Sequence, residues 1–240
     1  MISGFKNEND LFLSLNNKKI EDLDSNLKSL ILFIHKSKPN SIINCFKIGG
    51  EFKTDLTVRV DGKTYNLSIK KGTGNSVHQE KVDDFIEYLG KNFEPNNNVF
   101  ENIKHFIWAD GTITGKGEIK NRLSAGQYSK IFPDKINSIQ RYFDKHKDNL
   151  IRRFVIDGVS SKHTVDFLYY GSSEIGKCVS SNDILSFLNK SNSKGAISVG
   201  KLTFQAWNRN IKGGVKSEHK RGQIQLKWGS LKEDIQKFII

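Results

Sequence analysis

The chain has 240 residues, of which 36% are hydrophobic and 10% aromatic, so it can bury a core, which argues against wholesale disorder. No apolar run approaches the roughly 18 residues of a membrane span, and the first ten residues lack the apolar centre of a signal peptide, so we expect a cytoplasmic protein. The formal charge of +12 at pH 7 attracts polyanions, of which nucleic acid is the commonest. A composition rich in Lys and Asn can also give a positive net charge to a protein that does not bind nucleic acid.

Sequence periodicity predicts a helix and a hairpin in the first third of the chain. Apolar side chains at helical spacing predict an amphipathic helix over residues 20–36. Residues 55–60 and 64–70 alternate between apolar and polar and predict two strands joined by a tight turn. Ser76 is followed three residues later by a glutamine, the spacing of a helix-capping box, so we expect a helix over 77–89.

The remaining two thirds predict further helices and strands in alternation. In chain order, we expect mostly helix over 101–150, strands at 152–157 and 165–170, a short helix at 182–189, strands at 196–206 and 223–228, and a short helix to Ile240. Interleaved helices and strands indicate an α/β fold with a mixed β-sheet flanked by helices. We expect one domain over residues 1–240.

The predicted hairpin has one apolar and one polar face. A two-residue turn at Asp61-Gly62 would pair Val60 with Lys63 and thereby fix the register of the ladder. The apolar face would carry Leu56, Val58, Val60, Tyr65, Leu67 and Ile69. The polar face would carry Asp55, Thr57, Arg59, Asn66, Ser68 and Lys70. Asp55 and Lys70 are then within diagonal reach of each other across the ladder.

A carboxylate beside a lysine at a hairpin end suits metal-assisted cleavage of a phosphodiester. Asp55 can hold Mg²⁺, a hard cation that prefers oxygen ligands. The metal polarises a phosphate and lowers the pKa of a bound water. Lys70 can orient that water or neutralise charge that develops in the transition state. An aspartate at a strand start and a lysine at a strand end are also ordinary edge residues, so the pair alone does not establish a catalytic site.

The segments 53–55 (KTD) and 68–70 (SIK) resemble the motif of the PD-(D/E)XK nucleases, a superfamily that includes many type II restriction endonucleases. The resemblance covers about residues 50–90. It implies an αβββαβ catalytic core, which would occupy about residues 20–170, and Mg²⁺ as the cofactor. Thr54 replaces the proline of the motif, at a position that is structural.

Ser68 stands where the family pattern has its second acid. Some restriction enzymes of this family carry S-x-K and take the missing carboxylate from the next helix, which implies Glu80 as a catalytic residue and metal ligand. The resemblance also implies that Gln79 positions water or phosphate and that the backbone carbonyl of Ile69 binds the metal. Glu51, just before the hairpin, is the rival second acid.

Residues 201–227 carry seven Lys or Arg against one Glu. Arginine can contact guanine, asparagine can contact adenine, and lysines hold phosphates. The candidate DNA-binding residues are Arg209, Asn210, Lys212, Lys216, Lys220 and Arg221. The segment could equally be a solvated loop between two core strands. We expect the DNA-recognition elements at about residues 100–150 and 196–228.

Other motifs point to no competing chemistry. The glycine-rich run 111–117 lacks the spacing and the Ser or Thr of a P-loop, and the six histidines show no zinc-ligand spacing. Cys45 and Cys178 are expected to be small core residues rather than a disulfide. Asp157 and Asp166 are possible accessory acids, although surface strand positions explain them as well. Large aromatic residues near the C-terminus are expected in the core: Phe204, Trp207 and Trp228.

The sequence therefore predicts a type II restriction endonuclease that cuts double-stranded DNA at a short site. Because two-fold DNA sites favour two-fold proteins, we expect a homodimer. Two alternatives stay open. One is a repair or recombination nuclease of the same fold without sequence preference, and the other is a non-catalytic nucleic-acid-binding protein that lost its second acid at Ser68.

Overall fold

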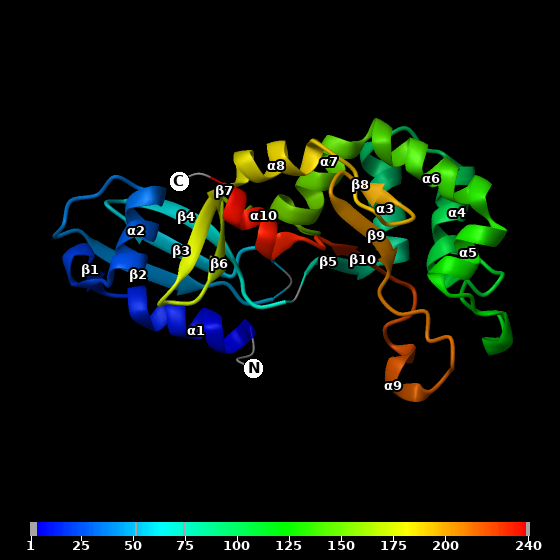
Figure 1. Cartoon of the computed structure of the whole chain (residues 1–240), viewed down its shortest axis with the longest axis horizontal. Coiled ribbons are helices and arrows are strands. Elements are labelled where there is room, and N and C mark those ends of the chain that lie inside the picture. Colours follow the sequence, from blue (N-terminus) through cyan, green and yellow to red (C-terminus); the bar gives the residue numbers. More distant parts are fainter. Residues whose placement is uncertain (1–3, 51, 74, 239–240) are drawn as a thin grey trace. The chain divides into compact units, whose positions relative to one another are not determined.

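The computed structural model describes residues 4–50, 52–73 and 75–238, which form two compact units. The first unit comprises the described parts of Met1–Asn75, Val155–Phe187 and Ser230–Ile240. The second comprises Ser76–Phe154 and Leu188–Gly229. Each unit contains its own sheet with helices, which confirms the α/β class (Figure 1). No helix in the described ranges is long and apolar enough to cross a membrane.

The first unit is built on a six-stranded mixed sheet in the order β1-β2-β3-β4-β6-β7. Its strands are β1 (Lys18–Lys19), β2 (Ile42–Lys47), β3 (Leu56–Val60), β4 (Lys63–Lys70), β6 (Phe167–Gly171) and β7 (Gly176–Ser180). Its helices are α1 (Gly4–Leu15), the 3₁₀ turn η1 (Ile20–Asp22), α2 (Ser25–Ile34) and α10 (Leu231–Lys237). All neighbouring strands are antiparallel except β4 and β6, which run parallel.

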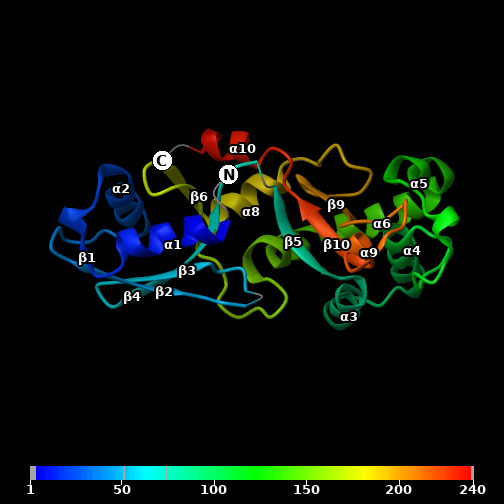
Figure 2. The same cartoon turned by 90° about the horizontal axis from the view of Figure 1, so that it is seen from below.

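Helices α1 and α2 cover one face of this sheet (Figure 2). Helix α2 begins at a capped end, where the side chain of Asp24 accepts a hydrogen bond from the Leu27 N–H at 2.9 Å. The helix predicted over 20–36 is thus present but begins with a 3₁₀ turn. The core between helices and sheet contains Leu11, Leu15, Leu27, Leu30, Ile31, Ile34, Ile43, Cys45, Val58, Leu67 and Cys178. Both cysteines are buried and unbonded, as expected.

The β3–β4 hairpin has the predicted register, with Val60 opposite Lys63 and Leu56 opposite Leu67. Both turn residues have positive φ, 48° at Asp61 and 74° at Gly62, which is the backbone that a two-residue hairpin turn needs. Five residues of the predicted apolar face are buried: Leu56, Val58, Val60, Leu67 and Ile69. This register places the polar ends of both strands together.

The second unit has a four-stranded antiparallel sheet in the order β5-β10-β9-β8. Its strands are β5 (Ser76–Lys81), β8 (Ser198–Val199), β9 (Leu202–Ala206) and β10 (Gln223–Lys227). Its helices are α3 (Val82–Asn92), α4 (Asn97–Trp108), η2 (Ile119–Asn121), α5 (Ala125–Ile131), α6 (Pro133–Lys145), α7 (Lys147–Arg152) and α9 (Val215–Glu218). An aromatic cluster joins the helices to the sheet: Phe85, Phe106, Phe143 and Phe204.

Two predicted elements have a different conformation. Residues 76–81 form strand β5 and not the start of a helix, because they pair with β10, some 145 residues later in the sequence. The helix begins only at Val82. Residues 153–157, predicted as part of a strand, form the π-helical turn η3 (Arg153–Asp157), which extends α7. The 153–157 segment is largely buried, and burial favours apolar residues in a helix and in a strand alike.

The later elements agree with the prediction more closely. The strand at 165–170 corresponds to β6, whose partners are β4 and β7. The short helix at 182–189 corresponds to α8 (Ser181–Asn189). The long strand predicted at 196–206 is divided into β8 and β9 by a turn at Gly200, whose φ is 55°. Helix α1 and strands β2 and β7 were not predicted.

Candidate active site

Asp55 lies directly before β3 and faces the end of β4. Its N–H donates to the Leu67 carbonyl at 2.9 Å. Its carboxylate oxygen Oδ2 accepts from the Ile69 N–H at 2.6 Å, from the Ser68 hydroxyl at 3.2 Å and from the Lys70 ammonium at 3.3 Å. The hairpin thus brings together four of the residues singled out from the sequence, Asp55, Ser68, Ile69 and Lys70.

Two oxygen atoms beside the Lys70 ammonium could serve as ligands of a hard cation. Lys70 Nζ lies 3.3 Å from Asp55 Oδ2 and 3.2 Å from the Ile69 carbonyl, so these two oxygens converge on one position. The side chains of Asp55 and Lys70 are 20% and 27% exposed, so water and a substrate can reach them. Among the described residues no group of three or more His, Cys, Asp or Glu side chains could hold a metal. A carboxylate, a carbonyl and several waters are nevertheless a usual ligand set for Mg²⁺.

Glu8, on helix α1, is an additional acid at this site that the sequence did not indicate. Burial raises the pKa of its carboxyl, and the charge of Asp55 raises it further, whereas Lys70 and Lys47 lower it. Glu8 therefore lies close enough to Asp55 and Lys70 to interact with both charges. No local motif marks it, because its proximity depends on how α1 packs on the sheet.

Glu80, the predicted second acid, belongs to the second unit and has other partners. It lies on β5, where Arg153 Nη2 donates to its Oε2 at 2.6 Å and His78 Nε2 lies 2.8 Å from its Oε1. Burial favours the neutral acid, but the hydrogen bonds and charges of His78 and Arg153 outweigh it and hold the pKa of Glu80 below its usual value. Arg153 also lies over the Tyr88 ring at 3.7 Å. The expected place in the first turn of a helix was wrong, and both carboxylate oxygens are occupied.

Two of the other residues that the sequence singled out, Gln79 and Asp166, make local hydrogen bonds. Gln79 is exposed on β5 and donates to the Ser76 hydroxyl at 3.2 Å. Asp166 accepts the Asn66 N–H at 2.8 Å and so supports the end of β6. Asp157 lies in the turn η3. Glu51 lies outside the described residues.

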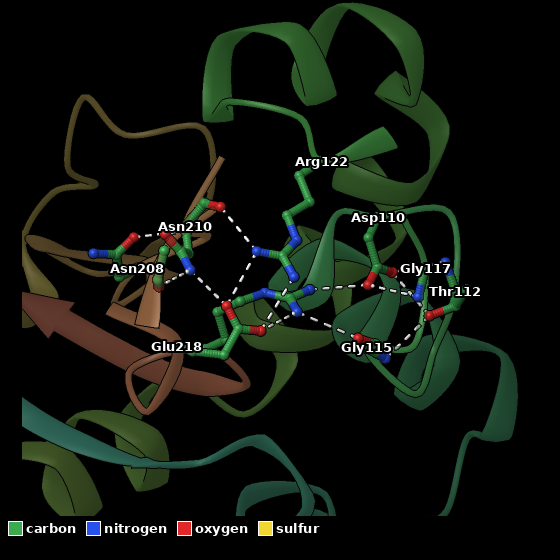
Figure 3. Close-up of polar contacts among 10 residues, drawn as sticks. Asp110, Thr112, Gly115, Gly117, Arg122, Asn208, Asn210 and Glu218 are labelled. Carbon is green, nitrogen blue, oxygen red and sulfur yellow. Dashed lines mark hydrogen bonds and ion pairs between the residues drawn. The ribbon is translucent and has the colours of Figure 1, made fainter. Parts of the chain in front are cut away.

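Three of the predicted DNA-binding residues are buried and engaged within the second unit. Arg209 donates to the Phe106 carbonyl at 2.7 Å, and burial lowers the pKa of its guanidinium to about 10. Arg221 pairs with Asp110 at 2.9 Å, and the Asn210 side chain donates to the Gly214 carbonyl at 2.9 Å (Figure 3). The structure therefore gives Arg209, Asn210 and Arg221 framework roles, in contrast to the base and phosphate contacts predicted for them.

The three lysines that were predicted to bind DNA are accessible, unlike Arg209, Asn210 and Arg221. Lys212 and Lys216 are exposed, and Lys220 is half-buried with its ammonium 5.2 Å from the Trp207 ring centre. None of the three forms an ion pair with another described residue. Trp207 is itself only half-buried, whereas Phe204 and Trp228 are core residues as predicted.

Comparisons with known proteins agree on the fold. No protein-family model matches the chain, and no curated protein sequence is significantly similar. Among solved structures, the chain is similar to the restriction endonuclease MspI in complex with its cognate DNA. That likeness has a TM-score of 0.60 and 16% sequence identity, and it covers 93% of this chain and 91% of that one. The fold of the chain, with its sheets and helices as described above, is therefore similar to that of a restriction endonuclease.

Proposed function

We propose that this protein is a Mg²⁺-dependent type II restriction endonuclease, which hydrolyses phosphodiester bonds of double-stranded DNA at a short specific site. The observation that carries the proposal is the convergence of Asp55, the Ile69 carbonyl and Lys70 at the end of one hairpin. The fold that holds this hairpin is similar to that of an enzyme solved with its cognate DNA, which supports DNA as the substrate.

The residues of the site have separable roles in this reaction. Asp55, the Ile69 carbonyl and Glu8 would hold the metal ion, which would supply electrostatic stabilisation of the phosphate and would acidify a bound water. The Ser68 hydroxyl and the Ile69 N–H fix the orientation of the Asp55 carboxylate. Lys70 donates to the attacking water and stabilises the negative charge that builds on the phosphate oxygens in the transition state.

The surface charge suits the same substrate. The chain carries a net charge of +12, and the accessible lysines Lys212, Lys216 and Lys220 lie on a loop between two strands of the second unit. Lysines of this kind bind phosphates and release condensed counterions, which gives affinity without sequence preference. Because a palindromic site is two-fold symmetric, a homodimer would present one active site to each strand.

Incubation of the purified protein with supercoiled plasmid and Mg²⁺ tests the proposal. We expect discrete fragments, no cleavage in EDTA, and no cleavage by an Asp55→Asn variant purified in the same way. The variant excludes a contaminating nuclease. A smear would indicate a nuclease without sequence preference, and intact plasmid under all metal conditions would show that the protein does not cleave DNA.

Glu8 provides a prediction about the metal. Glu8→Gln keeps the shape of the side chain and removes its charge, so it should raise the Mg²⁺ concentration for half-maximal cleavage by roughly tenfold or more. Because a proton on Glu8 would compete with the metal, the Mg²⁺ concentration for half-maximal cleavage should rise on acidification in the wild type. This rise should be less steep in Glu8→Gln, which has one titrating ligand fewer.

Asp10→Asn is the matched control, because Asp10 is on the same helix but about 200° around it from Glu8. It should leave the Mg²⁺ requirement unchanged. If Glu8→Gln and Asp10→Asn behave alike, Glu8 is not part of the metal site.

A further inference from the structure

Two loops of the second unit are joined by buried ion pairs. The 109–122 loop follows α4, and the 207–222 loop connects β9 to β10. Arg221 of the 207–222 loop donates to the Asp110 carboxylate at 2.9 Å and to the Gly115 carbonyl at 3.3 Å. The side chains of Arg221 and Asp110 are 4% and 0% exposed, so this contact is part of the interior.

Arg122 links the same two loops, but here the arginine belongs to the 109–122 loop and its acceptors to the 207–222 loop. From the 109–122 loop it donates to the Asn210 carbonyl at 2.9 Å and, through both terminal nitrogens, to the Glu218 carboxylate at 3.1 Å (Figure 3). The hydrogen bond from Arg221, with those from Asn210 and Arg122, lowers the pKa of Glu218 to about 2. Glu218 therefore stays ionised at any pH at which the protein would be used.

Apolar packing joins the same two loops. The Trp108 ring lies so close to Gly115 and Gly222 that a Cβ atom would come within 2.3 Å and 2.1 Å of it. A Cβ atom at Gly213 would lie 3.1 Å from Ile119 Cδ1. Because contacts of both kinds extend along the loops, the two loops form one ordered body rather than two independent flexible segments.

The internal ion pairs leave four lysines as the accessible uncompensated charge of this body, because Arg209, which has no acidic partner among the described residues, is buried. Asp110 and Glu218 neutralise Arg221 and Arg122, and Lys120 pairs with Glu118 at 2.6 Å. Four lysines remain without an acidic partner among the described residues: Lys116 on the 109–122 loop, and Lys212, Lys216 and Lys220 on the 207–222 loop.

Exposed aliphatic side chains accompany these lysines on both loops. Ile113 and Ile119 of the 109–122 loop are 40% and 51% exposed, and Ile211 and Val215 of the 207–222 loop are 43% and 92% exposed. Val215 begins α9, which stands away from the ends of β9 and β10 (Figure 1). Aliphatic groups between phosphate-binding lysines suit a DNA groove, where they can contact thymine methyl groups or base steps.

We propose that the 109–122 and 207–222 loops act as one preorganised DNA-binding element, in which Lys116 binds phosphate together with Lys212, Lys216 and Lys220, and Val215 contacts the groove. The inference rests on the proposed function, because it takes duplex DNA as the partner. It narrows the DNA-recognition element expected at about residues 100–150 to the 109–122 loop and adds Lys116 and Val215 as contact residues. It also explains Arg122 and Arg221 as the links between the two loops.

The test measures the salt dependence of binding to a labelled duplex of about 25 base pairs, in EDTA to prevent cleavage. Lys116→Ala should weaken binding roughly fivefold to tenfold near 0.1 M salt and reduce the slope of log K against log salt by about 0.9. Lys216→Ala should do the same. The control is Lys190→Ala, an exposed lysine after α8, on the side of the β8–β9 turn and away from the 207–222 loop. It should leave the slope unchanged.

Val215→Thr separates groove contact from charge. It keeps the branched shape and replaces one methyl group with a hydroxyl, so it should weaken binding several-fold without changing the salt slope, because no counterion is involved. The same variant should sediment as the wild type does. If Val215→Thr altered the oligomeric state and left DNA affinity intact, the aliphatic patch would bind a second copy of the chain, and the proposed groove contact would be wrong.

The outcomes distinguish this inference from the proposed function. A wild-type protein that cleaves DNA, with a Lys116→Ala slope equal to the wild-type slope, would show that the 109–122 loop does not bind DNA. A wild-type protein that neither binds nor cleaves duplex DNA would contradict the proposed function itself.

Discussion

Asp55→Asn is expected to lower the rate of DNA cleavage by about a thousandfold. Asparagine has the shape of aspartate but no charge, so the site loses its most central anionic ligand while the hydrogen bonds to Ser68 and Ile69 keep a similar geometry. Lys70→Met should have a comparable effect, because it removes the ammonium that lies 3.3 Å from the Asp55 carboxylate. Initial rates on a plasmid substrate at saturating Mg²⁺ give the measurement.

Asp61→Asn is the control for Asp55→Asn. It removes a carboxylate from the opposite end of the same hairpin, at a residue with φ of 48° that asparagine also tolerates. Its rate should match that of the wild type. DNA affinity in EDTA should not fall in Asp55→Asn, since a negative charge near the phosphates is lost. Cleavage at the wild-type rate by Asp55→Asn or Lys70→Met would refute the assigned site.

Glu80→Gln is expected to destabilise the second unit by about 3–5 kcal/mol. The Glu80 and Arg153 side chains are 2% and 5% exposed, so the variant leaves a buried guanidinium without its counter-charge. The control is Glu94→Gln, whose carboxylate pairs with Lys145 at 3.2 Å with side chains 80% and 63% exposed. The free energy of unfolding of Glu94→Gln should differ from that of the wild type by no more than about 0.5 kcal/mol, as for other surface ion pairs. Urea unfolding followed by circular dichroism measures both.

The pH dependence supplies an independent readout for Glu80. Its pKa is lowered in the folded state, so the unfolded chain binds the proton more readily in acid. This contribution to stability is present above the unfolded pKa and is lost as the pH falls through the lower, folded value. Wild-type stability should therefore decrease on acidification more steeply than that of Glu80→Gln. A variant of unchanged stability that no longer cleaves would instead support Glu80 as a metal ligand.

The hairpin of the candidate site could be predicted from sequence because its determinants are local. The Asp61-Gly62 turn fixes the register, and alternation of apolar residues fixes the buried face. Asp55, Ser68, Ile69 and Lys70 lie on that hairpin within 15 residues of one another, so their proximity follows from the register alone.

The features that the sequence did not reveal depend on contacts between distant parts of the chain. The segment 76–81 has a plausible helix start, but pairing with β10 makes it a strand and directs Glu80 toward Arg153. Glu8 reaches the site only through the packing of α1. Arg221 looks like a DNA-binding arginine in sequence, and only Asp110, 111 residues earlier, shows that it is part of the interior.

The parallel pairing of β4 with β6 also determines when the active-site sheet can form during synthesis. Leu67 lies opposite Phe167, so the strand that carries Ser68 and Lys70 has one open edge until another hundred residues have been made. All of Ser76–Phe154 leaves the ribosome in that interval. Domains generally fold as units as they emerge, and pairing at such separation is slow. Helices α3 to α7 can therefore form while β4 still has an open edge, whereas the sheet of the second unit must wait for β8, β9 and β10. A nascent chain shorter than about 170 residues lacks the parallel partner strand beside Lys70.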